Sequence, residues 1–72
     1  MSEPKLRGVV VQFDEHVGLG VVRGDDEQDY PFHCTQIAGG SRTIDEGTPV
    51  EFVVVPRLKD RLEAYDLTPS EP

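Results

Sequence analysis

The sequence has no tryptophan, a single cysteine and no long apolar run. One thiol has no partner within the chain, so the cysteine content gives no sign of an oxidising compartment. No stretch approaches the roughly 20 apolar residues that a transmembrane helix needs, and residues 1–5 lack the apolar core of a secretory signal. We therefore expect a cytoplasmic protein without a membrane partner.

Basic residues are also scarce. Seven Lys and Arg face 14 Asp and Glu, which gives a net charge of -7. Non-specific nucleic-acid binders draw most of their affinity from cations that neutralise phosphates. The composition therefore disfavours that class, although a local basic stripe can persist on an acidic protein.

The residue patterns of enzymes and metal proteins are missing. His16, His33 and Cys34 are too few for a tetrahedral metal site. The glycines of 18–20 lack both the dinucleotide-binding spacing and a following helix. A chain of 72 residues also leaves little room for a deep cleft. We predict no catalytic residues, no metal and no cofactor.

What the chain does contain is a series of short strand-forming segments separated by turns, at 6–13, 17–22, 30–34, 50–55 and 62–67. A turn of 3₁₀ helix is expected at 35–37, with Ile37 closing one end of the core. Five short strands without a helix favour an all-β fold, a five-stranded antiparallel barrel of the OB type. We expect one domain at 6–68 between flexible tails at 1–5 and 69–72.

Alternation along segment 30–34 separates an inner face from an outer face. Tyr30 and Phe32 are predicted to be buried, whereas Pro31 and His33 point outward. Because proline lacks an N–H, Pro31 should lie where no ladder bond is needed.

The order of motifs resembles the cold-shock domain family from Gly8 to Thr68. The matching pieces, in chain order, are Gly8-Val9-Val10 ahead of Phe13, Val17-Gly18-Leu19-Gly20-Val21-Val22, Asp25-Asp26, Tyr30-Pro31-Phe32-His33-Cys34, Ile37, Ile44-Asp45-Glu46-Gly47 and Ala64-Tyr65-Asp66-Leu67-Thr68-Pro69. The resemblance implies a barrel of the cold-shock type that binds single-stranded DNA or RNA. In that family, aromatic rings on the first three strands stack on bases and a few cations contact phosphates.

The departures from the family pattern fall on the ligand face. The family's tryptophan is replaced by Gln12, four phenylalanines by Leu19, Val21, Pro31 and Cys34, and two lysines by Val11 and Val17. Phe13 and His33 keep the family's residue type. The resemblance therefore implies a nucleic-acid-binding face that has lost most of its rings.

Two functions follow as hypotheses. The first is single-stranded nucleic-acid binding, weak or altered in base preference, by a monomer; its candidate residues are Gln12, Phe13, Leu19, Val21, Pro31, His33, Lys59 and Arg61. The second is a protein-interaction module that uses an apolar patch of Val11, Leu19, Val21 and Pro31. The choice between DNA and RNA, and the identity of any protein partner, stay open.

Overall fold

The computed structural model describes residues 5–40, 42–57 and 61–70, and these form a single antiparallel sheet. The order across the sheet is β3-β2-β1-β4-β5, and the strands are β1 (Leu6–Asp14), β2 (Leu19–Gly24), β3 (Asp29–His33), β4 (Pro49–Arg57) and β5 (Arg61–Pro69). The predicted all-β fold is confirmed. Within the described ranges, no helix is long and apolar enough to cross a membrane.

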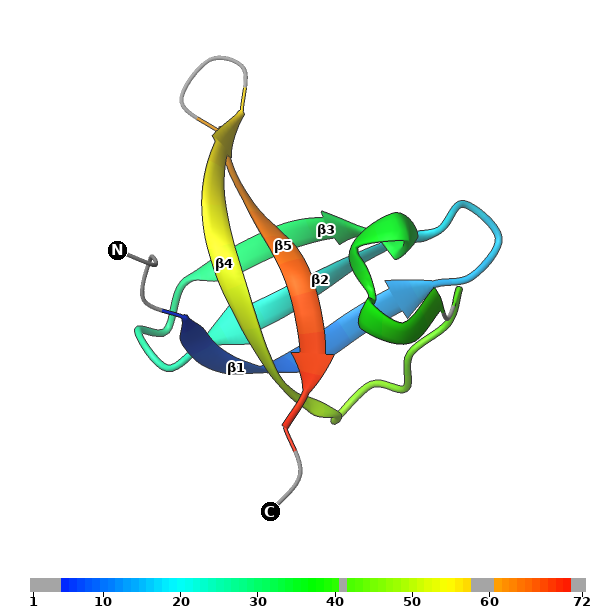
Figure 1. The fold of residues 1–72 in the computed structure, drawn as a ribbon, viewed down its shortest axis with the longest axis horizontal. Helices are drawn as coiled ribbons and strands as arrows, with labels where there is room; N and C mark the ends of the chain where they lie inside the picture. Colours follow the sequence, from blue (N-terminus) through cyan, green and yellow to red (C-terminus); the bar gives the residue numbers. More distant parts are fainter. Residues whose placement is uncertain (1–4, 41, 58–60, 71–72) are drawn as a thin grey trace.

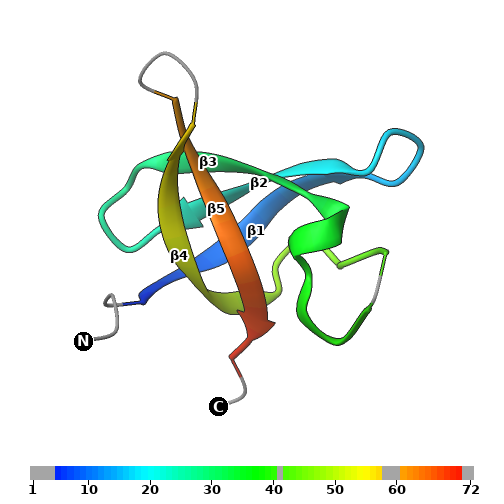
Figure 2. The same cartoon turned by 45° about the horizontal axis from the view of Figure 1, so that its top comes forward.

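The sheet curls into two crossing layers (Figures 1 and 2). The β4–β5 hairpin lies across the layer formed by β1, β2 and β3. β5 packs against β3, and a parallel bridge joins Ile37 to Leu67. Among the described residues no ladder joins β3 to β5. In this part of the chain, the predicted barrel is therefore not closed by hydrogen bonds between β3 and β5, although the two strands pack against each other.

The second strand begins later than predicted, at Leu19 instead of Val17. Gly18 adopts a φ of 72°, and its N–H donates to the Asp14 carbonyl at 2.8 Å. The Asp14 carboxylate also accepts the His16 N–H at 2.9 Å. These local bonds hold residues 14–18 as a turn, which the apolar character of Val17 conceals.

The last strand extends one residue into the predicted C-terminal tail. β5 continues through Pro69, and the Ser70 N–H donates to the Pro49 carbonyl at 2.8 Å. Most of the two predicted tails, residues 1–4 and 71–72, lie outside the described residues.

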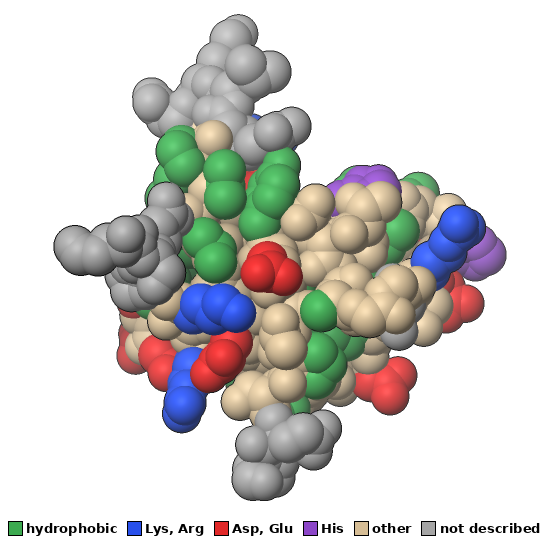
Figure 3. All heavy atoms as spheres, viewed as in Figure 1, with side chains coloured by type: hydrophobic (Ala, Val, Ile, Leu, Met, Phe, Trp, Pro, Cys, Tyr) green, Lys and Arg blue, Asp and Glu red, His purple; other side chains and the backbone are tan. Residues whose placement is uncertain are grey.

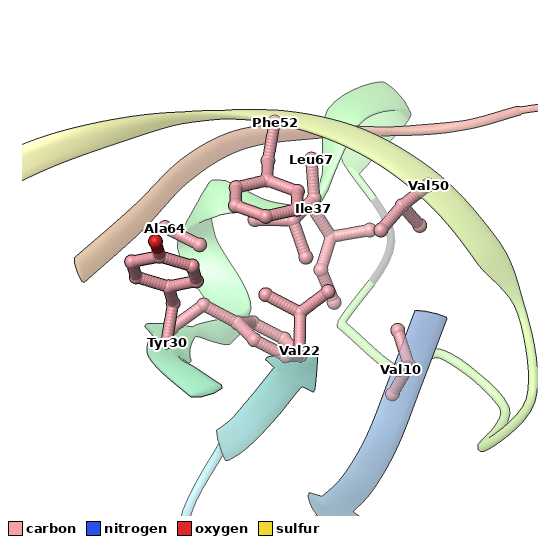
Figure 4. Packing of buried hydrophobic residues seen from close by; sticks show 9 residues of the cluster. Val10, Val22, Tyr30, Ile37, Val50, Phe52, Ala64 and Leu67 are labelled. Atoms are coloured by element: carbon pink, nitrogen blue, oxygen red, sulfur yellow. The ribbon is translucent and has the colours of Figure 1, made fainter. Parts of the chain in front are cut away.

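The core lies between the two layers. Figure 4 shows Phe52 of β4 pointing toward Tyr30 and Val22 of the opposite layer, and the Tyr30 and Phe52 rings are 5.6 Å apart. The buried cluster consists of Val10, Val22, Tyr30, Phe32, Ile37, Val50, Phe52, Ala64 and Leu67. The predicted burial of Tyr30 and Phe32 is confirmed. Ile37 closes the core after the 3₁₀ turn η1 (Cys34–Gln36), and a second turn, η2 (Ala38–Gly40), follows it.

A β-bulge in β1 determines which side chains reach the outer face. Val10 pairs with Val22, yet Gln12 pairs with Val21, so Val11 is an extra residue. Val11 and Gln12 are therefore both exposed, and Phe13 turns inward. Strict alternation would instead have placed Val11 and Phe13 on one face.

Candidate functional site

The outer face of β1, β2, β3 and β5 contains a groove of about 680 Å³. It collects six of the eight predicted site residues, namely Gln12, Leu19, Val21, Pro31, His33 and Arg61. Phe13 is not among its lining residues, and Lys59 lies outside the described residues. Side chains far apart in the sequence therefore meet in one concave surface.

Leu19, Val21 and Pro31 form the floor of the groove. Leu19 pairs with His33 across the strands and Val21 pairs with Pro31, so these four side chains lie in two adjacent rows. Leu19 is 52% exposed. The floor offers apolar contact without the flat π surface of an aromatic ring.

Pro31 occupies a position where its missing N–H costs no ladder bond. The Cys34 N–H donates to the Gly18 carbonyl at 2.8 Å. Such bonds recur at every second residue of an antiparallel edge strand. The backbone N–H groups of residues 32 and 30 therefore also point toward β2, whereas the backbone at position 31 points away from it. The predicted placement of Pro31 follows from this register.

His33 is held in a defined orientation at the start of η1. Its Nδ1 accepts the Thr35 N–H at 3.2 Å and lies 3.0 Å from Thr35 Oγ1. Since a backbone N–H can only donate, Nδ1 must carry a lone pair, and we assign the ring proton of the neutral form to Nε2. His33 can therefore offer an N–H donor to a ligand in the groove.

Phe13 contributes to the wall beneath the groove. Its ring lies 6.0 Å from the Phe32 ring, with an angle of 11° between the two planes. It pairs with Gly20, where an added Cβ would lie 2.5 Å from Phe32 Cζ. The Phe32 ring therefore fills the space that the absent side chain of Gly20 leaves. Phe13 itself is half-buried.

Charges of both signs surround the groove. Arg61 lines it together with Asp14 and Glu63. Figure 3 shows acidic and basic side chains interspersed on the face seen in Figure 1, with hydrophobic side chains gathered over the β4–β5 hairpin. The described surface in this view has no continuous basic stripe.

Two arginines on the sheet are already paired with carboxylates. Arg23 donates two hydrogen bonds to Asp29, at 2.7 and 3.2 Å, and Arg7 lies 3.3 Å from Glu51. The Asp29 hydrogen bond raises the pKa of Arg23, and the same bond lowers the pKa of Asp29. These pairs reduce the positive charge available for phosphates.

The groove residues that were not among the eight candidates are Asp14, Val17, Gly20, Phe32, Thr35, Gln36, Glu63 and Tyr65. The resemblance had already placed Val17 on the ligand face, as the replacement of a lysine. Tyr65 follows the buried Ala64 on β5 and lies on the groove side. The sequence left its orientation open, because Leu67, three residues after Ala64, is also apolar and alternation from Leu67 would turn Tyr65 inward. Thr35 and Gln36 enter through η1, whose direction depends on the fold.

No group of three or more metal-binding side chains is found in the part of the chain that the structure describes.

Three of the four residues proposed as an apolar patch for a protein partner line the groove, and Val11 does not. Leu19 and Pro31 are exposed in the groove, and Val21 is half-buried there. Val11 is 37% exposed but does not line the groove, since the bulge places it beside Gln12.

Comparison with known proteins gives a consistent result. The model of the 'Cold-shock' DNA-binding domain matches residues 6–70. Among solved structures, the chain is similar to drosophila Unr CSD456, with a TM-score of 0.82 and 30% sequence identity. The alignment covers 99% of this chain and 29% of that one. A search of curated proteins found no match.

Proposed function

This chain belongs to the cold-shock domain family of nucleic-acid-binding, non-enzymatic domains, and on that premise we propose that it binds single-stranded DNA or RNA through the groove. The supporting observation is that six of the eight candidate positions line one groove. The ligand would lie across the outer faces of β1, β2, β3 and β5, with Arg61 near a phosphate. His33 would donate from Nε2 to an acceptor on a base or on the backbone.

The binding we propose is weak. Stacking of one base on an aromatic side chain contributes roughly 1–3 kcal/mol. Leu19 and Val21 stand where the family carries rings, and both keep only apolar contact. The net charge of -7 opposes the approach of a polyanion, so affinity should be measurable mainly at low salt.

The base preference we propose is altered as well. Gln12 is exposed beside Val21, in the place of the family's tryptophan. A glutamine side chain can bond an adenine through N6 and N7, whereas an indole ring stacks on any base. The groove therefore offers hydrogen bonds to base edges where the family offers stacking.

We further propose that residues 6–68 act as one monomeric domain in the cytoplasm. The support comes from the composition and from the single core. Because the chain spans 29% of the Unr chain that it resembles, the role of any larger assembly is not carried over.

A binding titration tests the proposal. Fluorescein-labelled oligo-dT, oligo-U and oligo-A are titrated with the full chain at low salt and followed by anisotropy. We expect saturable binding that weakens as salt rises, with oligo-A favoured over oligo-dT. The absence of binding to any of them at several hundred micromolar protein would reject the function. The salt series is informative because counterion release reports the number of phosphates engaged.

A second candidate function is protein binding through the same floor. The observation that favours it is the exposure of Leu19, 52% of its surface, beside the acidic groove residues Asp14 and Glu63. Aliphatic surface with a charged rim suits a protein partner. If no oligonucleotide binds, a partner whose affinity is lost in Leu19→Asp and retained in Val9→Asp would support this function.

A further inference from the structure

We infer that Tyr65 is a base-stacking side chain, and that the stacking surface of this protein lies on the β3–β5 half of the groove instead of the β1–β2 half. The inference deepens the proposed function and depends on it. Tyr65 lines the groove together with His33 and Arg61.

The β1–β2 half of the groove has no aromatic side chain facing outward among the described residues. Its lining residues from this side are Gln12, Asp14, Val17, Leu19, Gly20 and Val21. The one ring of β1, Phe13, is half-buried and parallel to Phe32. A base placed here would meet aliphatic or amide groups.

A bulge in β5 allows Tyr65 to face the groove while Leu67 stays in the core. Ala64 and Leu67 are both buried, which simple alternation does not allow for residues three apart. The pairing changes from Glu51↔Thr68 to Val53↔Tyr65, and Asp66 adopts a φ of 58°. The bulge thus returns Leu67 to the core and leaves Tyr65 on the outer face.

The bulge is tied to the neighbouring element of the groove. The Asp66 N–H donates to Gln36 Oε1 at 3.3 Å, and Gln36 belongs to η1, the turn that His33 caps. The segments that carry Tyr65 and His33 are therefore connected directly. The Tyr65 ring is half-buried, the His33 ring is exposed, and both line the same groove.

Arg61 lies on the same face of β5 as Tyr65. Strand residues four apart point to one side and are separated by about 13 Å. One strand thus presents a ring for a base and a cation for a phosphate. This pairing of a stacking platform with a positive charge is what single-stranded nucleic-acid sites use.

The test compares Tyr65→Leu, which removes the ring, with the matched control Tyr65→Phe, which keeps it. With labelled oligo-A we expect Tyr65→Leu to weaken binding by about 5- to 150-fold, the effect of one stacked base, and Tyr65→Phe to stay within about twofold of wild type. Amide spectra of each variant check the fold. In the wild-type chain, the Tyr65 ring protons should shift on titration, and this readout does not depend on a variant.

The outcomes separate the inference from the function beneath it. If wild type binds and Tyr65→Leu binds equally well, Tyr65 is not a platform and the proposed function stands. A loss in Tyr65→Phe as large as in Tyr65→Leu assigns the effect to the hydroxyl and also overturns the inference. If Tyr65→Leu fails to fold, unshifted wild-type ring protons overturn it. No binding by wild type rejects both.

Discussion

The inner and outer faces of β1, β2 and β3 carry very different residues on the same backbone. The inner face keeps large buried side chains such as Phe32, which is 2% exposed. The outer face carries Gln12, Leu19 and Val21, which line the groove at positions that the resemblance of motifs matches with aromatic residues. The inner face fixes the fold through packing, whereas exposed positions can change with little effect on stability. The comparison teaches that the inside of this sheet holds the fold together, and we propose that its outside sets the strength of binding.

The largest expected effect comes from the inner face. Phe32→Ala should lower the free energy of unfolding by about 3–5 kcal/mol, because it removes a buried ring and leaves a cavity. Leu19→Ala, on the outer face of the neighbouring strand, should change it by about 0.5 kcal/mol or less. Chemical denaturation of both variants provides the measurement. Equal losses of unfolding free energy in the two variants would contradict this contrast between the faces, since they would show that the outer face also determines the fold.

The next effect concerns binding. The triple variant Gln12→Trp, Leu19→Phe, Val21→Phe restores three rings to the β1–β2 half of the groove. If missing rings limit affinity, binding to oligo-dT should rise by at least about tenfold, since each stacked base contributes 1–3 kcal/mol. Anisotropy titration measures it. An unchanged affinity would show instead that the acidic field sets the limit.

A smaller effect is expected from the Arg23–Asp29 pair on the outer face. Asp29→Asn removes the carboxylate that holds Arg23 at 2.7 Å and so releases a cation toward phosphates. Affinity for oligo-A should rise by about two- to fivefold, the scale of an exposed ion pair, with a steeper salt dependence. The matched control Asp45→Asn makes the same charge change at a carboxylate that forms no ion pair among the described residues. Neither Asp45 nor the Arg23–Asp29 pair lines the groove, so the two variants differ in the release of Arg23. An equal gain in both variants would assign the effect to net charge alone.

The smallest expected effect concerns the hydrogen bond between Tyr30, on the inner face, and Asp26, in the turn between β2 and β3. The Tyr30 hydroxyl donates to Asp26 at 2.6 Å and lowers the pKa of that carboxyl, with a further contribution from the Gln28 N–H. Because the folded pKa lies below the unfolded value near 3.8, the stabilisation is complete above that pH and is lost as pH falls through the folded value.

The same bond raises the pKa of Tyr30. This contribution is complete below the unfolded value near 10.0 and is lost as pH rises through the folded value. Unfolding measured from pH 2 to 6 should show a shallower acid decline in Asp26→Asn than in wild type, with oligonucleotide binding at pH 7 unchanged. Identical declines would contradict the role given to Asp26.

Much of the fold could be predicted from the sequence. Alternation at Tyr30, Pro31 and Phe32 gave the correct faces, and the order of motifs gave the correct family. The start of β2 was misplaced because the bonds to Asp14 that turn the chain at Gly18 leave no trace in hydrophobicity. The bulge at Val11 was invisible for a similar reason, since an extra residue shifts the period of two without changing composition.

The site was predicted less completely. The family motifs drew attention to β1, β2 and β3, and they gave no reason to examine Tyr65. Its position depends on the bulge at Asp66 and on the packing of β5 against β3, both of which are tertiary features. The pairing of Arg23 with Asp29 likewise follows from strand register, so its cost to phosphate binding could not be judged from the sequence.

Residue-by-residue amide mapping of wild type with unlabelled oligo-A at low salt tests the central claim most directly. We expect shifts concentrated at Leu19, His33, Arg61 and Tyr65 that reverse as salt is added, with the turn at Asp45–Gly47 unaffected. Shifts spread evenly over the surface, or none at several hundred micromolar oligonucleotide, would contradict the assignment of this groove as a nucleic-acid-binding site.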